Sequence, residues 1–161
     1  MRRFSINQDG QTRTVDVRIP PGVGDGSRVR VAGEGTPGAG GAQAGDLYLR
    51  IRVAPNLRFE RKGKDLYTHV AVPLTTAVLG GDAEVRTLSG KLLRLKIPEA
   101  TQNGQVFRLK GHGMPAVGKS ADAGDLYATV NVELPRQLTS EQREHFEALR
   151  KLSTSAKQTV A

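Results

Sequence analysis

Three aspartates are the most regularly placed side chains that could carry out chemistry. Asp46, Asp65 and Asp125 each precede a Leu-Tyr pair at the expected start of a strand. A carboxylate can act as a general base or a metal ligand, but both tasks need partner groups arranged around one centre. Because the same tripeptide recurs three times, whereas catalytic groups rarely occur in repeated copies, we expect these aspartates to shape turns and strand starts.

The other candidate reactive groups are also isolated. None of the histidines, His69, His112 and His145, lies at metal-ligand spacing from another histidine or a carboxylate. The chain has no cysteine, which excludes disulfides, thiol catalysis and thiolate metal sites. The Gly-x-Gly pairs at 33–35 and 111–113 lack the third glycine and the helix of a dinucleotide fingerprint. The sequence therefore predicts a protein that is not an enzyme and that needs no cofactor or metal.

Charge and length narrow the choice of partner. The 161 residues carry a formal net charge of +8, which could attract nucleic acid. Most Lys and Arg residues, however, fall at the polar positions of alternating strands, and aromatic residues make up only 4%, too few for a base-stacking platform. Nucleic acid is therefore a secondary partner. With no bilayer-spanning run and no signal peptide at the start, a cytoplasmic protein without a membrane partner is expected.

An internal repeat underlies the order of the expected strands and turns. Residues 19–37, IPPGVGDGSRVRVAGEGTP, align with residues 97–115, IPEATQNGQVFRLKGHGMP, at an offset of 78, and a Gly-Asp-Leu-Tyr segment follows each copy at an offset of 79. Short alternating apolar runs with 19 glycines and eight prolines favour strands and turns. The repeat predicts an all-β protein of two tandem small β-sandwich domains, residues 1–58 and 59–135.

The second copy contains opening elements that the first copy lacks. A strand is expected over residues 66–72, a helical turn over 74–79 ended by Gly80-Gly81, and a strand from Ala83 that pairs beside the first. In the first copy the strand over residues 2–7, which carries Phe4 and Ile6, is the earliest element. We therefore expect that strand to present an unpaired edge.

Phe4 and Ile6 leave two interpretations open. Both lie on one side of their strand, with Arg2, Arg3 and Arg13 close in sequence or across the hairpin. They could form an apolar edge to which an extended peptide adds, or they could belong to an ordinary core. Phe59 is the one large apolar group of the connector over residues 54–62, where a plug between the two domains is the simplest role.

The C-terminal segment predicts one helix over residues 136–152. Thr139 and Gln142 have the spacing of a capping box. The segment carries an apolar stripe that consists of Leu138, Phe146, Leu149 and Leu152. Such a stripe needs a surface to lie on. Residues 153–161 are small and polar, so we expect a flexible tail.

Taken in order, these motifs resemble a known family over nearly the whole chain. The stretches IPPGVGDGSRVRVAGEGTPG, GDLYLRIRVAPNLRFERKGKDLYTHVAVPLTTAVLGG, LKIPEATQNGQVFRLKGHGMP and GDLYATVNVELPRQLTSEQREHFEALRKL are similar to the C-terminal client-binding region of DnaJ-type co-chaperones. The resemblance implies two tandem β-sandwich domains and a C-terminal helix that forms a homodimer. It also implies that the first domain binds unfolded clients and the acidic C-terminal tail of a DnaK-type chaperone.

The resemblance assigns roles to particular positions. It places the client groove at Phe4, Ile6 and Phe59, the tail contact at Arg2 and Arg13, and the dimer contact at Leu138, Phe146, Leu149 and Leu152. No His-Pro-Asp occurs, so the J-domain is absent from this chain, and without cysteine the resemblance is to the subclass lacking the zinc-binding insertion. The expected function is ATP-independent holding of unfolded clients and their delivery to a DnaK-type chaperone. The alternative is a DNA-binding or nucleoid-associated protein that uses its basic surface.

Overall fold

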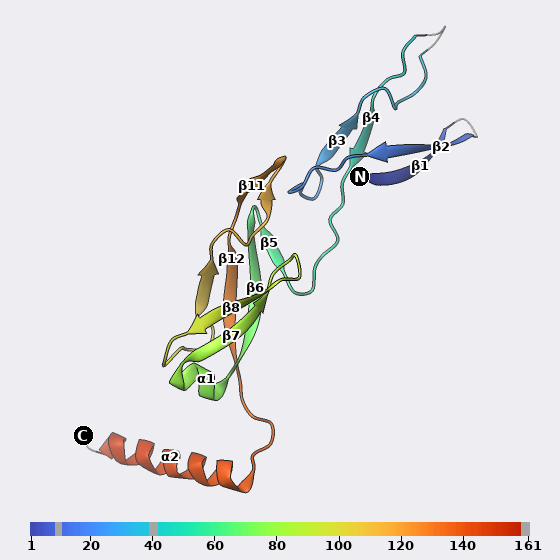
Figure 1. The fold of residues 1–161 in the computed structure, drawn as a ribbon. Coiled ribbons are helices and arrows are strands. Elements are labelled where there is room, and N and C mark those ends of the chain that lie inside the picture. The colour runs from blue at the N-terminus through green and yellow to red at the C-terminus, as the bar shows by residue number, and fades with distance from the viewer. Residues whose placement is uncertain (9–10, 39–41, 159–161) are drawn as a thin grey trace.

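The computed structural model describes residues 1–8, 11–38 and 42–158. The chain is built from short strands with one short helix and one long C-terminal helix, and it is extended, with the N-terminal hairpins at one end and the long helix at the other (Figure 1). We call residues 2–53 the first unit and residues 59–133 the second unit. No helix among the described residues has the length and apolar character needed to cross a membrane.

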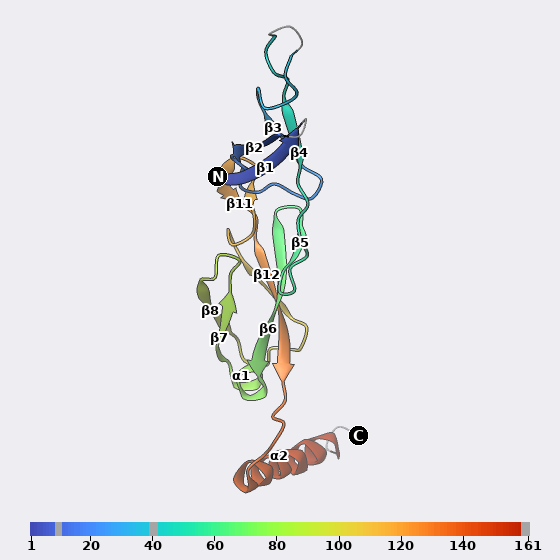
Figure 2. The ribbon, with the colours of Figure 1, turned by 90° about the vertical axis from the view of Figure 1, so that its right-hand side faces the viewer.

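The first unit consists of two hairpins. Strands β1 (Arg2–Gln8) and β2 (Gln11–Val17) pair antiparallel, and so do β3 (Arg28–Val31) and β4 (Leu47–Arg50). The first hairpin lies beside the second in two perpendicular views (Figures 1 and 2). The tip of the predicted turn between β1 and β2, residues 9 and 10, lies outside the described residues.

The second unit is a more complete sandwich. One layer is a four-stranded sheet, in the order β5 (Glu60–Lys62), β6 (Asp65–Pro73), β12 (Leu126–Glu133), β9 (Val106–Leu109). The central strands β6 and β12 run parallel, and the outer pairs are antiparallel. The other layer is the hairpin of β7 (Gly81–Arg86) and β8 (Leu92–Ile97). Strands β10 (Pro115–Ala116) and β11 (Lys119–Ala123) form a small additional hairpin.

The core lies between the two layers of the second unit. Alternate residues of β6 point inward, and Val70 and Val72 join Ala83 and Val85 of β7 in one cluster of buried side chains. Full burial of a Val or Leu side chain is worth about 1.5–3 kcal/mol, so this cluster dominates the stability of the chain. In the first unit, Val15 and Val17 are the hydrophobic residues that reach comparable burial among the described residues.

The partner of β7 differs from the sequence-based expectation. The strand from Ala83 was expected to pair beside residues 66–72, but β7 pairs with β8, while β6 pairs with β5 and β12. Helix α1 (Leu74–Leu79) carries the chain from one layer to the other, so successive strands belong to different sheets. By the repeat, the counterpart of β6 would lie beside β4 and not beside β1. Strand β1 does have the predicted unpaired edge, because it pairs only with β2 among the described residues, but a missing partner strand was the wrong reason for it, since β7 likewise pairs only with β8.

The hydrogen bonds confirm the repeat. Ile51 N–H donates to the Ser27 carbonyl at 2.8 Å, and in the second unit Val130 N–H donates to the Gln105 carbonyl at the same distance. The connector was predicted without a strand, but it contains β5, which pairs with the start of β6. The sequence Glu-Arg-Lys of β5 has no apolar alternation that would have revealed it.

The C-terminal helix α2 (Ser140–Gln158) begins at the predicted capping box, four residues after the predicted start at residue 136. The Thr139 hydroxyl accepts a hydrogen bond from Gln142 N–H at 3.2 Å, and the Gln142 side-chain oxygen accepts one from Thr139 N–H at 3.0 Å. The helix continues past Leu152 to Gln158, into the segment for which the sequence predicted a tail. There Ser153 and Thr154 donate their hydroxyls to carbonyls one turn earlier, which satisfies these side chains within the helix. Residues 159–161 lie outside the described residues.

Candidate functional site

Asp125 and its counterpart Asp46 shape turns, as the sequence predicted. Asp125 Oδ1 accepts a hydrogen bond from Gly111 N–H at 2.8 Å, and Oδ2 accepts one from Arg108 Nε at 2.6 Å. Asp46 makes the same two contacts in the first unit, at 3.1 Å and 2.6 Å, with Gly33 N–H and Arg30 Nε. The backbone N–H first, and the guanidinium second, lower the pKa of both carboxyls. Both carboxylates are therefore committed to holding the turn after the preceding strand.

The predicted apolar pair Phe4 and Ile6 lies on one face of β1. The register sets Phe4 opposite Val15 and Ile6 opposite Arg13, and directly opposed residues share a face of the sheet. Phe4 is 37% exposed and Ile6 is half-buried, while Val15 is buried. The hairpin therefore presents a partly open apolar face.

Arg2 and Arg13 share this face but differ in their contacts. Arg2 is exposed and forms no ion pair within the described part of the chain. The guanidinium of Arg13 donates to the carbonyls of Glu34 and Gly35 and lies 3.4 Å from the Glu34 carboxylate. Arg13 thus fastens the β1–β2 hairpin to the turn that follows β3, and Arg2 is the cation of the two that is exposed to an approaching ligand.

Phe59 lies apart from Phe4 and Ile6. Its side chain is 9% exposed and packs in the buried cluster of the second unit, with Leu66. It also lines a cavity of about 690 Å³ between the two units, to which Val53 contributes but Phe4 and Ile6 do not. The structure thus brings together Phe4, Ile6 and Arg2, and it places Phe59 at the junction where the connector meets the second unit.

The junction is held by Arg61 of β5. Its Nη1 donates to the Val23 carbonyl at 2.7 Å and its Nη2 donates to the Gly22 carbonyl at 2.8 Å. Gly22 has a φ of +82°, and a Cβ there would collide with the carbonyl of Pro115. Sequence analysis missed Arg61, because a lone arginine in a polar connector gives no pattern that marks it.

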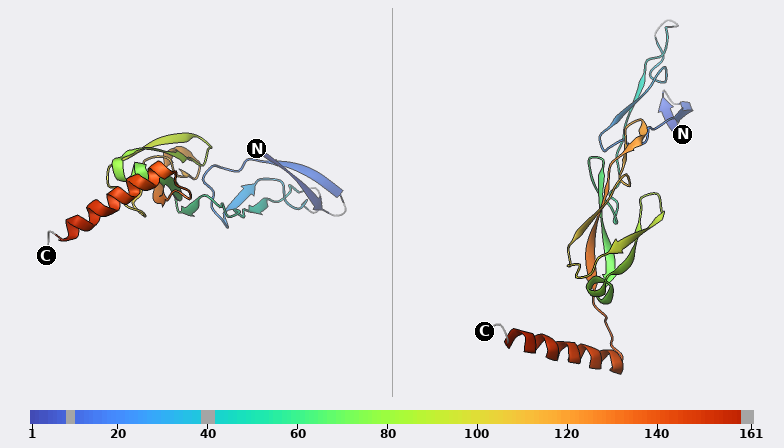
Figure 3. Two further views of the ribbon diagram at one scale, coloured as in Figure 1. Left: turned by 90° about the horizontal axis from the view of Figure 1, so that it is seen from below. Right: turned by 60° about the vertical axis from the view of Figure 1, so that its left-hand side comes forward.

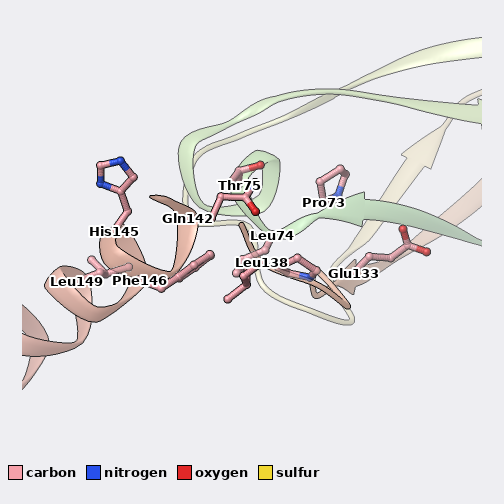
Figure 4. A pocket seen from close by; sticks show the side chains of 10 residues that line it. Pro73, Leu74, Thr75, Glu133, Leu138, Gln142, His145, Phe146 and Leu149 are labelled. Atoms are coloured by element: carbon pink, nitrogen blue, oxygen red, sulfur yellow. The ribbon is translucent and has the colours of Figure 1, made fainter. Parts of the chain in front are cut away.

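The predicted apolar stripe of α2 faces a pocket against the end of the second unit. The pocket has a volume of about 420 Å³, and Leu138, Phe146 and Leu149 line it together with Leu74 of α1. Figure 4 shows Phe146 extending from the helix toward Leu138 and Leu74. Leu149 and Leu152 are 56% and 69% exposed. The helix projects from the domain (Figure 3), so most of its apolar stripe is uncovered.

These features define a class of protein. No group of three or more His, Asp or Glu side chains that could hold a metal occurs in the described ranges. What the chain offers is a pair of β units with a half-open apolar face and a projecting helix with exposed leucines. That combination is typical of a module that binds other polypeptides.

The chain belongs to the DnaJ C-terminal domain family, whose model matches residues 2–135. It is 50% identical over 144 residues to the chaperone protein DnaJ of Brucella canis, of Brucella suis and of Brucella abortus. The alignment covers 89% of this chain and 38% of each relative, so the chain spans less than half the length of these curated proteins. The structure confirms the predicted fold of mostly β-strands in small sheets with a C-terminal helix.

Proposed function

We propose that the chain binds unfolded or non-native polypeptides and delivers them to a DnaK-type chaperone, holding them without ATP. The observation that carries this proposal is the partly open apolar face of the β1–β2 hairpin. An apolar ring that is 37% exposed on an edge strand gives an extended peptide both backbone partners and a surface for large side chains. The proposal is tested by measuring whether variants at Phe4 and Ile6 still keep a denatured client from aggregating.

Phe4 and Ile6 are the client-contacting residues in this proposal. Phe59 contributes from the junction, where it lines the cavity between the units. Binding of a client to Phe4 and Ile6 is driven by the removal of apolar surface from water, which contributes a free energy of roughly 25 cal/mol per Å² of apolar surface buried. Such binding tolerates many sequences, as a chaperone requires.

The acidic C-terminal tail of the DnaK-type partner is the proposed ligand of Arg2. Arg2 shares a face with Phe4 and is exposed, so a carboxylate can approach its guanidinium. Arg13 contributes mainly by fixing the hairpin through Glu34 and Gly35, and its partial exposure leaves room for a second carboxylate contact. The proposed compartment is the cytoplasm, and the chain resembles the subclass without the zinc-binding insertion.

Homodimerisation through α2 completes the proposal. The exposed Leu149 and Leu152 extend the apolar surface that Leu138 and Phe146 begin, and a second copy is the partner that would cover it. Two copies joined at this end would hold their first units apart, facing a client from two sides.

Nucleic acid is the second candidate partner, and one observation favours it. Arg28 lies directly opposite Arg50 in the β3–β4 hairpin, with exposed Tyr48 on the same face. A basic strip with one aromatic ring could contact a phosphate backbone and a base. Phosphate binding weakens steeply with salt, whereas apolar capture of a client does not, so the ionic strength dependence separates the two functions.

A further inference from the structure

We propose that Asn103–Gly104 is a site at which the chain modifies itself by deamidation, and that the folded turn around it controls the rate. The asparagines of the chain are Asn7, Asn56, Asn103 and Asn131, and of these Asn103 alone precedes a glycine. Glycine has no side chain to hinder its backbone nitrogen, so this nitrogen attacks the preceding side-chain amide more readily than the nitrogen of a bulkier residue does. The inference is independent of the proposed function.

The reaction needs only water. The Gly104 nitrogen gives up its proton and bonds to the side-chain carbon Cγ of Asn103, while the side-chain nitrogen takes up a proton and leaves as ammonia. The product is a cyclic imide. Water then opens the ring at either carbonyl carbon. One opening gives aspartate, and the other gives isoaspartate, in which the backbone is lengthened by the side-chain carbon.

The fold itself requires this labile pair. Gln105 N–H closes the turn by donating to the Gln102 carbonyl at 3.2 Å, and within the turn Gly104 has a φ of +83°. A φ in the left-handed region at the third position of a turn favours glycine. The Asn103 side chain extends the ladder between β9 and β12, because its oxygen Oδ1 accepts a hydrogen bond from Val132 N–H at 2.9 Å. The turn and the ladder thus separately select the two residue types that react with each other.

In the folded chain both reacting groups are engaged by β12. Gly104 N–H donates to the Val130 carbonyl at 2.8 Å, so the nitrogen keeps its proton. The Asn103 amide is oriented by its hydrogen bond from Val132 N–H. Attack of the nitrogen on the amide therefore requires the turn to separate from β12, a local opening that costs free energy. Asn103 is exposed, so water reaches the imide once it has formed.

The equivalent turn of the first unit indicates which product the fold accepts. Asp25 occupies the position of Asn103 in the repeat, and its Oδ1 accepts a hydrogen bond from Val53 N–H at 2.9 Å. Gly26 has a φ of +76°, and its N–H donates to the Ile51 carbonyl at 2.8 Å. A carboxylate oxygen thus fills the role of the amide oxygen. Deamidation to aspartate leaves the turn and its ladder intact.

Isoaspartate is the product that changes the structure. Its longer backbone and shorter side chain move the acceptor oxygen away from Val132 N–H. Just before the turn, Thr101 N–H donates to the Ala77 carbonyl of α1 at 2.9 Å, so the turn links α1 to the end of β12. From that end the chain runs through residues 134–139 into α2. Isoaspartate at position 103 therefore weakens the link at the base of the C-terminal helix.

The test incubates the full chain near neutral pH, with and without denaturant, and follows each asparagine by mass spectrometry of its peptides. We expect Asn103 to deamidate while Asn7, Asn56 and Asn131 stay unmodified over the same period. The folded chain should deamidate at least about tenfold more slowly than the unfolded chain. In a series of low denaturant concentrations, the deamidation rate should rise in parallel with exchange of the Gly104 amide, because both processes require release of that N–H.

The two products are tested separately. Asn103→Asp should have the melting temperature of the wild type at neutral pH and should protect the Val132 amide equally well. The isoaspartate form, separated by chromatography, should exchange the Val132 amide at least about tenfold faster than the wild type. Asn103→Ala, which lacks the acceptor oxygen, is the matched control for loss of this hydrogen bond and should exchange Val132 as fast as the isoaspartate form.

Equal deamidation rates in the folded and unfolded chains would overturn the inference, because the turn would then have no control over the reaction. So would modification of the other asparagines at the rate of Asn103, or unchanged protection of Val132 in the isoaspartate form. A melting temperature of Asn103→Asp below that of the wild type at neutral pH would show that the second unit does not accept aspartate as the first unit does, and would also contradict it.

Discussion

Phe4 and Val15 lie directly opposite each other in the β1–β2 hairpin, yet Val15 is 4% exposed and Phe4 is 37% exposed. Both side chains occupy one face of a two-stranded sheet, so the difference reflects what covers each strand. The counterpart of Phe4 in the second unit is Val85, because Val85 pairs with Leu93 as Phe4 pairs with Val15, and Val15 and Leu93 are related by the repeat. Val85 is 2% exposed within the buried cluster, so Phe4 is much more open than its counterpart.

Strand β4 pairs only with β3 among the described residues, which predicts a specific exchange pattern for this chain. Because successive N–H groups of a strand point to opposite edges, Ile51 N–H bonds to Ser27 across the pair while Tyr48 and Arg50 face the open edge. We expect Tyr48 and Arg50 amides to exchange much faster than those of Tyr127 and Thr129, measured by NMR. Equal protection of these two pairs would contradict the assignment of the open edge.

The first unit should also open before the second. The second unit holds the large buried cluster, while Val15 and Val17 are the comparably buried hydrophobic residues described in the first unit. Exchange at residues 4–7 should therefore require less free energy than exchange at residues 83–86, in a denaturant series of native-state exchange. A single common opening free energy for both segments would show that the two units unfold together.

The aspartate turns predict a pH dependence of stability. The pKa of Asp125 is lowered in the folded state, first by Gly111 N–H and then by Arg108, so its contribution is fully present above the unfolded value of about 3.9. The contribution is lost as the pH falls through the lower, folded-state pKa. We expect Asp125→Asn to be less stable than the wild type at pH 7 and the difference to shrink below about pH 4. Thermal unfolding at several pH values measures this, and a difference that stays constant with pH would contradict it.

Helix α2 is predicted to form the dimer. A chain truncated after Pro135 should sediment as a folded monomer, and the full chain of 17.3 kDa should sediment at twice its mass. Leu149→Ser should weaken the dimer, because it removes an exposed apolar side chain from the stripe, whereas Glu147→Ser on the same helix should not. A full chain that remains monomeric at high concentration would contradict dimerisation.

The repeat explains why much of the fold could be predicted from the sequence. The alternation of β6 and the capping box at Thr139 depend on neighbours in sequence, which a local pattern records. The turn role of Asp125 was predicted because its tripeptide recurs, although its partners lie 14 and 17 residues away. The partner of β7 depends on which layer the chain enters after α1, and alternation does not encode that choice. The Arg61 junction depends on carbonyls 38 and 39 residues away, so no local signal could reveal it.

Part of the candidate site could also be predicted from a local pattern. Phe4, Ile6 and Arg2 fall on one face because a strand alternates with a period of two. Phe59 was grouped with them by resemblance, and the structure places it with the second unit instead.

The most direct test of the proposed function is the suppression of aggregation of a chemically denatured client by the full chain carrying Phe4→Ser and Ile6→Ser. We expect the double variant to lose holding activity while its far-UV circular dichroism is unchanged, because both side chains are partly exposed and their loss removes client contact area rather than core. Ser5→Ala, on the opposite face of the same strand, is the control and should hold the client normally. A double variant that suppresses aggregation as well as the wild type would contradict the account.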